Sequence, residues 1–121
     1  MLTLRSLRAL AIDMDGVLYK GNTAQPGAPA FVRWLQGRRF PFVLLTNNST
    51  LDAQAYERKL AAIGIEVPAD QILTSASVTA DYLARNYPPH SRVFIIGESG
   101  LEREITARGL VISDDTPQIV V

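Results

Sequence analysis

The sequence predicts an α/β fold in which helices pack on both faces of a parallel, doubly wound sheet. Three continuous apolar runs are typical of strands that are buried on both faces. Stretches with helical periodicity lie between and after these runs, and the alternation favours a series of strand–helix–strand units. The predicted strands span residues 7–14, 40–46 and 92–97, and the predicted helices span residues 28–39, 51–64, 75–89 and 99–109.

The composition is that of an ordinary soluble domain. Of the 121 residues, 47% are hydrophobic, and 12 basic side chains balance 12 acidic ones. This balance gives no indication of a nucleic-acid or membrane-surface partner. The apolar run at the N-terminus is too short for a membrane span, and the absence of cysteine excludes disulfides and thiol catalysis. We therefore expect a cytoplasmic protein.

The first predicted helix, residues 28–39, connects the first two strands. Phe31, Trp34 and Leu35 recur in it at i, i+3 and i+4. Side chains at this spacing share one face of a helix, so these three residues are expected to face the core.

The next two predicted helices lie between the second and third strands. The helix at residues 51–64 follows Ser49 and Thr50, which are residue types that cap helix N-termini. The helix at residues 75–89 ends at two prolines, which cannot continue a helix.

The last predicted helix, residues 99–109, begins with Ser99 and Glu102 at the spacing of a capping box. The segment after it has a turn and then ends on apolar residues that resemble the start of a strand. This segment is either an edge strand that finishes the protein or part of a sequence cut short. We expect residues 1–112 to form the N-terminal part of a core and residues 113–121 to begin a connection to further structure.

Three polar clusters follow the predicted strands. They are DMDG (13–16), TNNST (46–50) and GESG (97–100). Ligands of parallel α/β sheets bind beyond the carboxyl ends of the strands, so these loops are expected to converge on one crevice. GESG lacks the glycine spacing of a dinucleotide-binding loop and is interpreted as a tight turn into the last helix.

Asp13 and Asp15 stand at the end of the first predicted strand. Side chains two residues apart leave an extended chain on the same side, with Met14 opposite. Two carboxylates this close repel each other unless a cation neutralises them, and oxygen ligands suit Mg²⁺. Gly16 permits a sharp turn that directs amide hydrogens toward the ion's surroundings. The alternative is a plain turn in which the acids cap a loop.

The TNNST cluster has the donors of an anion site. Thr46 offers a hydroxyl, Asn47 and Asn48 offer amide donors, and the following helix adds free backbone N–H groups at its positive end. Together these groups suit phosphate. The alternative is that asparagine, serine and threonine are present only as helix caps.

The motifs DMDGVLYKG, LLTNNST and VFIIGESGLEREI resemble the haloacid dehalogenase (HAD) superfamily of Mg²⁺-dependent phosphatases. Within it they resemble subfamily IIA, the branch of 4-nitrophenyl phosphatases and N-acetylglucosamine-phosphate phosphatases. The resemblance covers essentially the whole chain and implies a Rossmann-like core. It also implies that the chain holds only the N-terminal part, with the first three strands, and stops before or at an α/β cap domain.

The resemblance implies hydrolysis of a phosphate monoester, with a small phosphorylated metabolite as substrate and Mg²⁺ as cofactor. Asp13 is implied as the nucleophile, which forms an aspartyl phosphate, and Asp15 as the general acid and base. Both are implied as Mg²⁺ ligands, Asp15 through its backbone carbonyl. The positions implied to hold the phosphoryl group are Gly16, Thr46, Asn47 and Asn48.

A lysine and later metal-binding acids that the family requires are not matched. Lys20 is interpreted as part of a small flap, and Lys59 as a solvated position paired with Glu57 or its neighbours. Asp114 and Asp115 precede a Thr-Pro turn and are interpreted as turn residues. We therefore expect little or no turnover from these residues alone.

Two other functions remain open. A non-catalytic HAD-like module would bind Mg²⁺, phosphate or a protein partner and would fold stably by itself. A phosphoacceptor receiver domain also uses clustered acids, but it needs an aspartate at the end of the third strand, where this sequence has IIGESG. The substrate and the oligomeric state are left open, and a homo-oligomer stays among the expected assemblies.

Overall fold

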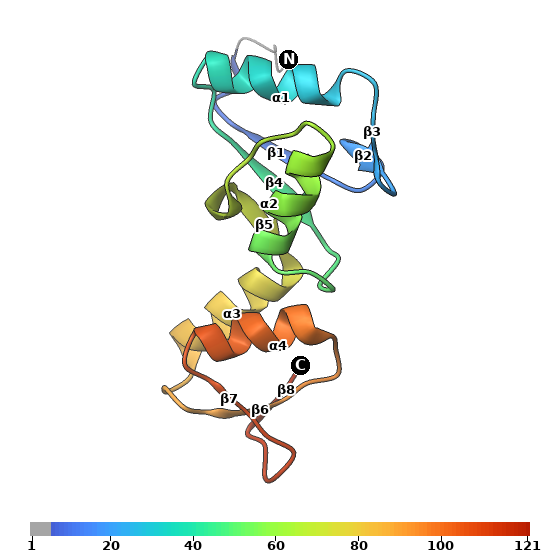
Figure 1. The fold of residues 1–121 in the computed structure, drawn as a ribbon. Helices are drawn as coiled ribbons and strands as arrows, with labels where there is room; N and C mark the ends of the chain where they lie inside the picture. Colours follow the sequence, from blue (N-terminus) through green and yellow to red (C-terminus); the bar gives the residue numbers. More distant parts are fainter. Residues whose placement is uncertain (1–5) are drawn as a thin grey trace.

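The computed structural model describes residues 6–121. It contains two parallel sheets (Figure 1). Each sheet has three strands and its own cluster of buried hydrophobic side chains. We call residues 6–74 the first unit and residues 75–121 the second unit. The strand order is β1-β4-β5 in the first sheet and β7-β6-β8 in the second. The predicted α/β class with parallel strands is confirmed.

The first unit holds the segments that carry the predicted site. Its elements are β1 (Leu10–Asp13), β2 (Tyr19–Lys20), β3 (Thr23–Ala24), α1 (Ala28–Gly37), β4 (Phe42–Thr46), α2 (Ala53–Ala62), the 3₁₀ helix η2 (Ala69–Gln71) and β5 (Ile72–Thr74). Asp13 lies opposite Leu45, and Thr46 lies opposite Thr74. This parallel register brings the carboxyl ends of all three strands to one edge. The short antiparallel pair β2-β3 forms the expected flap beside this edge.

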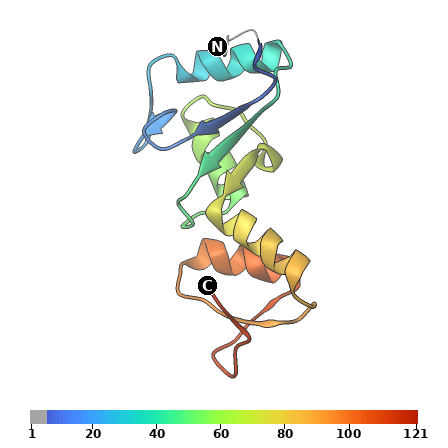
Figure 2. The ribbon, with the colours of Figure 1, turned by 180° about the vertical axis from the view of Figure 1, so that it is seen from behind.

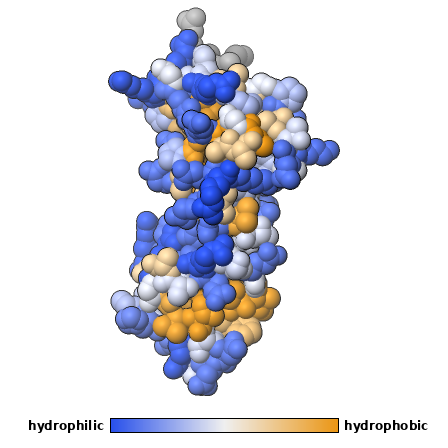
Figure 3. Space-filling model, in the orientation of Figure 1, coloured by the Kyte–Doolittle hydropathy of each residue, from blue (hydrophilic) through white to orange (hydrophobic). Residues whose placement is uncertain are grey.

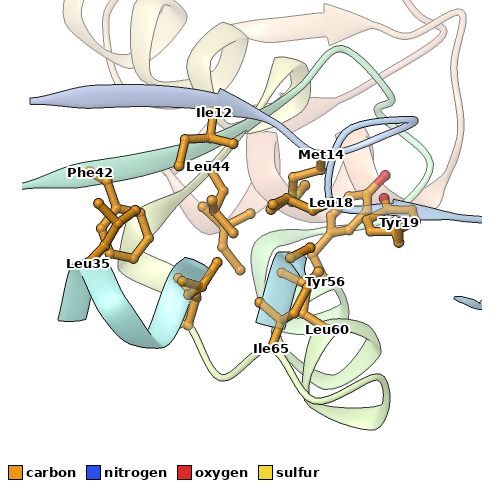
Figure 4. Close-up of a cluster of buried hydrophobic side chains, with 14 residues drawn as sticks. Ile12, Met14, Leu18, Tyr19, Leu35, Phe42, Leu44, Tyr56, Leu60 and Ile65 are labelled. Atoms are coloured by element: carbon orange, nitrogen blue, oxygen red, sulfur yellow. The ribbon is translucent and has the colours of Figure 1, made fainter. Parts of the chain in front are cut away.

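Both helices of the first unit cover the same face of its sheet. Figure 4 shows the side chains of Ile12, Phe42 and Leu44 extending from the strands toward α1 and α2. On the other face, Leu45 is only partly buried and Leu73 is 36% exposed. The chain steps from β1 to β4 to β5 in one direction, and right-handed crossovers in one direction place their helices on one side. Within residues 6–121, helices therefore cover one face of this sheet.

The core-facing side of α1 differs from the prediction. Ala28, Val32 and Leu35 are buried, whereas Phe31 and Trp34 are exposed and stack on each other with ring centroids 6.1 Å apart. The expected stripe was therefore wrong for the two aromatic residues. Both sets have helical spacing and lie side by side on the helix, so periodicity alone cannot separate them.

The second unit is a smaller version of the first. Its elements are α3 (Ser75–Asn86), β6 (Arg92–Phe94), α4 (Ser99–Ala107), β7 (Val111–Ile112) and β8 (Ile119–Val120). The two helices lie between the two sheets in both views (Figure 2). Val93 and Ile119 face these helices, whereas Val120 and Ile96 are exposed. Figure 3 shows hydrophobic side chains gathered over this end of the molecule.

The third strand of the first sheet is β5, which the sequence did not predict. The expected third strand, at residues 92–97, forms β6 in the second sheet instead. β5 was missed because its three residues include only two apolar ones. The expected division between residues 1–112 and 113–121 stays a prediction, although β7 and β8 lie on either side of it and both pair with β6.

Two helices begin differently from the prediction. Asp52, and not Ser49 or Thr50, caps α2, and its side chain accepts a hydrogen bond from the Ala55 N–H at 2.8 Å. The N-cap of α4 is Glu98, which makes no side-chain capping bond, so the expected capping box is not formed there. None of the helices within residues 6–121 has the length and apolar character needed to cross a membrane.

Candidate active site

The DMDG and TNNST loops meet at the carboxyl edge of the first sheet. Because β1 and β4 are parallel neighbours, the residues that follow them leave the sheet side by side. The Thr46 hydroxyl donates a hydrogen bond to Asp15 Oδ2 at 3.2 Å. This bond joins two motifs that are 31 residues apart in the sequence.

Met14 separates the two acids and anchors the loop that carries them. It is fully buried, whereas Asp13 and Asp15 are exposed, which is the alternation expected for an extended chain. The Met14 N–H donates to the Leu45 carbonyl at 3.0 Å, and the Met14 carbonyl accepts from the Leu18 N–H at 2.9 Å. The acids therefore project away from the core on a backbone that is fixed at both sides.

Gly16 makes the turn that follows the acids. Its φ of 79° lies in the left-handed region, which glycine adopts without steric strain. Its N–H donates to the Tyr19 carbonyl at 2.8 Å, and its carbonyl accepts from Gln25 Nε2 at 3.3 Å. Phosphate binding by the Gly16 N–H, which stays a prediction, would require the bond to Tyr19 to open.

The TNNST loop is folded back on Thr46. The Asn48 N–H donates to Thr46 Oγ1 at 3.1 Å, and the Thr50 N–H donates to Asn48 Oδ1 at 3.0 Å. Thr46 is buried, so its hydroxyl serves the loop on one side and Asp15 on the other. Asn47 and Asn48 are exposed, which leaves their side-chain amide groups accessible to a ligand.

Two buried tyrosines lie beneath the site, and sequence reasoning gave them no role. Tyr56 Oη donates to the Asn48 carbonyl at 3.5 Å. Tyr19 Oη is buried near the Asp15 carboxylate but makes no hydrogen bond of normal geometry among the residues that the structure describes. Burial raises the pKa of both phenols, and the negative charge of Asp15 raises the pKa of each further. The only signal in the sequence was the position of Tyr19, three residues after Gly16 of the acidic motif.

The two lysines lie in different surroundings. Lys20 is exposed in β2, as expected for the flap. The expected pairing of Lys59 with Glu57 was wrong, because Lys59 Nζ lies 4.4 Å from the centre of the Tyr19 ring, and Glu57 accepts from the Ala69 N–H. A cation over an aromatic ring is attracted by the electron density of its face. Lys59 therefore packs beneath the acidic loop.

The acids present could hold a hard cation. Within residues 6–121, no three histidine, cysteine, aspartate or glutamate side chains are grouped as metal ligands. Mg²⁺ needs fewer, since it is commonly bound by one or two carboxylates together with waters and a phosphate. The Asp13 carboxylate and the Asp15 backbone carbonyl supply oxygen donors of this kind, and the exposure of both residues leaves room for the waters.

The acids and amides of the predicted site are exposed at the edge of the sheet. A cavity of about 660 Å³ lies elsewhere, between the start of α2, β5, α3 and α4. Its lining includes Asp52, Arg103 and Arg108 and none of the predicted site residues. The GESG loop nevertheless reaches the predicted site, because Gly100 packs against the backbone of Ser49 and Thr50.

Known proteins resemble this chain in both sequence and fold. The sequence pattern of haloacid dehalogenase-like hydrolases matches residues 10–111. The acid sugar phosphatase of Staphylococcus saprophyticus is 39% identical over 112 residues, which cover 93% of this chain and 43% of that protein.

Solved structures give the same result. A 4-nitrophenylphosphatase from Thermotoga maritima aligns with a TM-score of 0.87 at 35% identity, covering 94% of this chain and 43% of that one. A glycerol phosphate phosphatase from Mycobacterium tuberculosis, solved in complex with magnesium, aligns with a TM-score of 0.82 at 30% identity, covering 96% of this chain and 36% of that one. The chain thus spans less than half the length of these relatives.

Proposed function

The chain belongs to the haloacid dehalogenase-like hydrolase family, and we propose that it carries the first part of a phosphatase active site. The hydrogen bond between Thr46 and Asp15 supports this most directly, because it unites the acidic loop with the phosphate-binding loop. The remainder of the site would belong to a longer parent protein, of the length that the relatives have. The names of those relatives support a small phosphorylated metabolite as its substrate.

Asp13 and Asp15 have distinct roles in the proposed reaction. The Asp13 carboxylate attacks the phosphorus, the bond to the leaving oxygen breaks, and Asp15 donates a proton to that oxygen. Asp15 then takes a proton from a water, whose attack on the aspartyl phosphate releases phosphate and regenerates Asp13. Before a phosphate binds, Thr46 orients Asp15 through their hydrogen bond.

Mg²⁺ would be held by the Asp13 carboxylate and the backbone carbonyl of Asp15 and, when bound, would offset the negative charges of the acids and the phosphate. The phosphoryl group would be held by Gly16, Asn47 and Asn48, and by Thr46 once its single hydroxyl proton turns from Asp15 to the phosphate. A cytoplasmic location, the absence of nucleic-acid and membrane partners, and a homo-oligomeric state stay predictions.

Ligand binding to the 121-residue chain tests the first part of this proposal. Amide signals are followed by NMR while Mg²⁺ and inorganic phosphate are added. We expect shifts at residues 13–16 and 46–48, and we expect Asp13→Asn to abolish the response to Mg²⁺. Asp114→Asn is the matched control, because Asp114 lies in an exposed turn of the second unit. Shifts that avoid both loops would contradict the proposed site.

Turnover tests the second part. We expect the parent protein to hydrolyse 4-nitrophenyl phosphate with Mg²⁺, and Asp13→Asn to lower kcat by at least about a thousandfold, because no other group replaces the nucleophile. The 121-residue chain should show little or no turnover. Binding by the chain without turnover by the parent would instead support the non-catalytic module.

A further inference from the structure

Residues of the second unit contact the loop at residues 46–52, which contains the proposed phosphate-binding residues. We propose that Gly100 and Arg103, at the start of α4, are positioning residues that fix the backbone of residues 46–52. The inference rests on the proposed function of this loop. It adds a role for a helix that belongs to the other sheet and contains none of the predicted site residues.

Gly100 approaches the loop so closely that no side chain can fit between them. A Cβ at this position would lie 2.6 Å from the Ser49 carbonyl oxygen and 2.9 Å from the Thr50 carbonyl oxygen. Real Cβ atoms essentially never come within 3.0 Å of such atoms. Both oxygens belong to the backbone, so no side-chain rotation can relieve the contact. A methyl group here must displace either the loop or the helix.

Arg103 holds the far end of the same loop. Its Nε donates to Asp52 Oδ2 at 2.7 Å, while Asp52 Oδ1 accepts from the Ala55 N–H at 2.8 Å. Asp52 therefore links the two units, because one oxygen caps α2 and the other binds α4. The contact lies beside the cavity of about 660 Å³, whose lining includes both residues.

A third contact comes from α3. Ser75 Oγ donates to the Asn47 carbonyl at 3.0 Å. The second unit thus contacts the loop at Asn47, at Ser49 and Thr50, and at Asp52. On its opposite side the loop is held by the bond of Asn48 to Thr46. A shift of α4 would therefore change where the exposed amide groups of the loop lie, and with them the affinity for phosphate.

The experiment compares variants of the 121-residue chain. Gly100→Ala and Arg103→Ala disturb the two contacts, and Arg103→Lys keeps the charge. Gly37→Ala is the control for the first, because Gly37 also lies in a helix but a Cβ added there would meet no atom within 4 Å. Arg85→Ala is the control for the second, because Arg85 is an exposed arginine in the last turn of α3, within the second unit.

Two readouts are taken. Amide hydrogen exchange of residues 47–52 reports the position of the loop and does not depend on any ligand. NMR titration with inorganic phosphate in the presence of Mg²⁺ reports its function. We expect faster exchange in Gly100→Ala and Arg103→Ala only, and a phosphate affinity lower by about tenfold in Gly100→Ala, because small misplacements of binding groups weaken binding strongly. Arg103→Lys should recover part of the effect of Arg103→Ala.

Each outcome decides the matter. Unchanged exchange of residues 47–52 in both variants would overturn the positioning role, as would equal effects from the two controls. Faster exchange with unchanged phosphate affinity would overturn its link to binding. If the unaltered chain binds no phosphate, the proposed function fails, but the exchange measurements still decide whether α4 positions the loop.

Discussion

The two units share an architecture, but only the first has a chemically equipped edge. Each is a three-stranded parallel sheet with two helices on one face. After β1 and β4 the first unit presents acids and amides, whereas β6 is followed by Ile95 and Ile96. The Ile96 N–H donates a hydrogen bond to the Val121 carbonyl at 2.7 Å. A parallel sheet therefore provides a place for a site, and the residues directly after its strands decide whether one exists.

The two hydrophobic cores also differ in composition and in their distance from the predicted site. The core of the first unit extends under its site and includes two buried tyrosines, Tyr19 and Tyr56. The core of the second unit is built from aliphatic side chains, two of them the alanines Ala76 and Ala80. The buried core of the first unit therefore lies directly beneath the predicted site. The second unit reaches the loop at residues 46–52 through the contacts of α3 and α4.

The largest expected effect tests whether the two cores are separate. Leu44→Ala in the first unit and Ile105→Ala in the second each truncate a side chain with no exposed surface. Each should lower the free energy of unfolding by about 3 kcal/mol, because burial is lost and a cavity remains. Urea titration measures the loss, and hydrogen exchange shows which amides lose protection. Loss confined to the altered unit supports two cores, while equal loss in both units would show one cooperative structure.

The strands and motifs that are continuous in sequence were the predictable part. β1 and β4 were found inside predicted strands, and Met14 is buried between Asp13 and Asp15 as the alternation predicted. Each of these depends on residues next to one another. Their meeting at one edge follows from parallel pairing, which the alternation of strands and helices already indicated.

The features that depend on distant contacts could not be predicted. β5 is a strand because it pairs with β4, and its own three residues carry too weak a pattern. The sequence indicated only that Gly100 belongs to a turn. Its contact with the Ser49 and Thr50 carbonyls depends on the placement of α4 beside them, which local sequence does not reveal. The buried face of α1 likewise depends on which of two apolar stripes fits the sheet.

A smaller effect tests the polar group buried under the site. Tyr19→Phe removes a hydroxyl that lies near Asp15 but makes no hydrogen bond of normal geometry within residues 6–121, and it keeps the ring beneath Lys59. We expect the free energy of unfolding to rise by about 1 kcal/mol, because an unsatisfied buried hydroxyl destabilises the fold. Chemical denaturation measures the change. Tyr56→Phe is the control and should give no gain, because its hydroxyl bonds to the Asn48 carbonyl. A loss of stability in Tyr19→Phe would show that its hydroxyl is bonded in solution.

The smallest effect tests the ion pair that joins the units. Burial alone would raise the pKa of Asp52, but the Ala55 N–H and Arg103, together with the more distant Arg58, lower it below its ordinary value of 3.8. A lowered pKa means that the carboxylate stabilises the fold above pH 3.8 and that this contribution is lost as the pH falls through the lower, folded-state pKa.

Asp52→Asn should therefore flatten the acid end of the stability curve. Arg103 is about half exposed, so solvent screening limits the contribution of the pair to about 0.5 kcal/mol. Urea titrations between pH 2 and pH 6 measure it, and Asp81→Asn, which alters a pair inside the second unit, is the control. If the pair links the units, Asp52→Asn should also speed the exchange of residues 47–52, whereas Asp81→Asn should not. Equal exchange in both variants would mean that the second unit holds the loop through Gly100 and Ser75 alone.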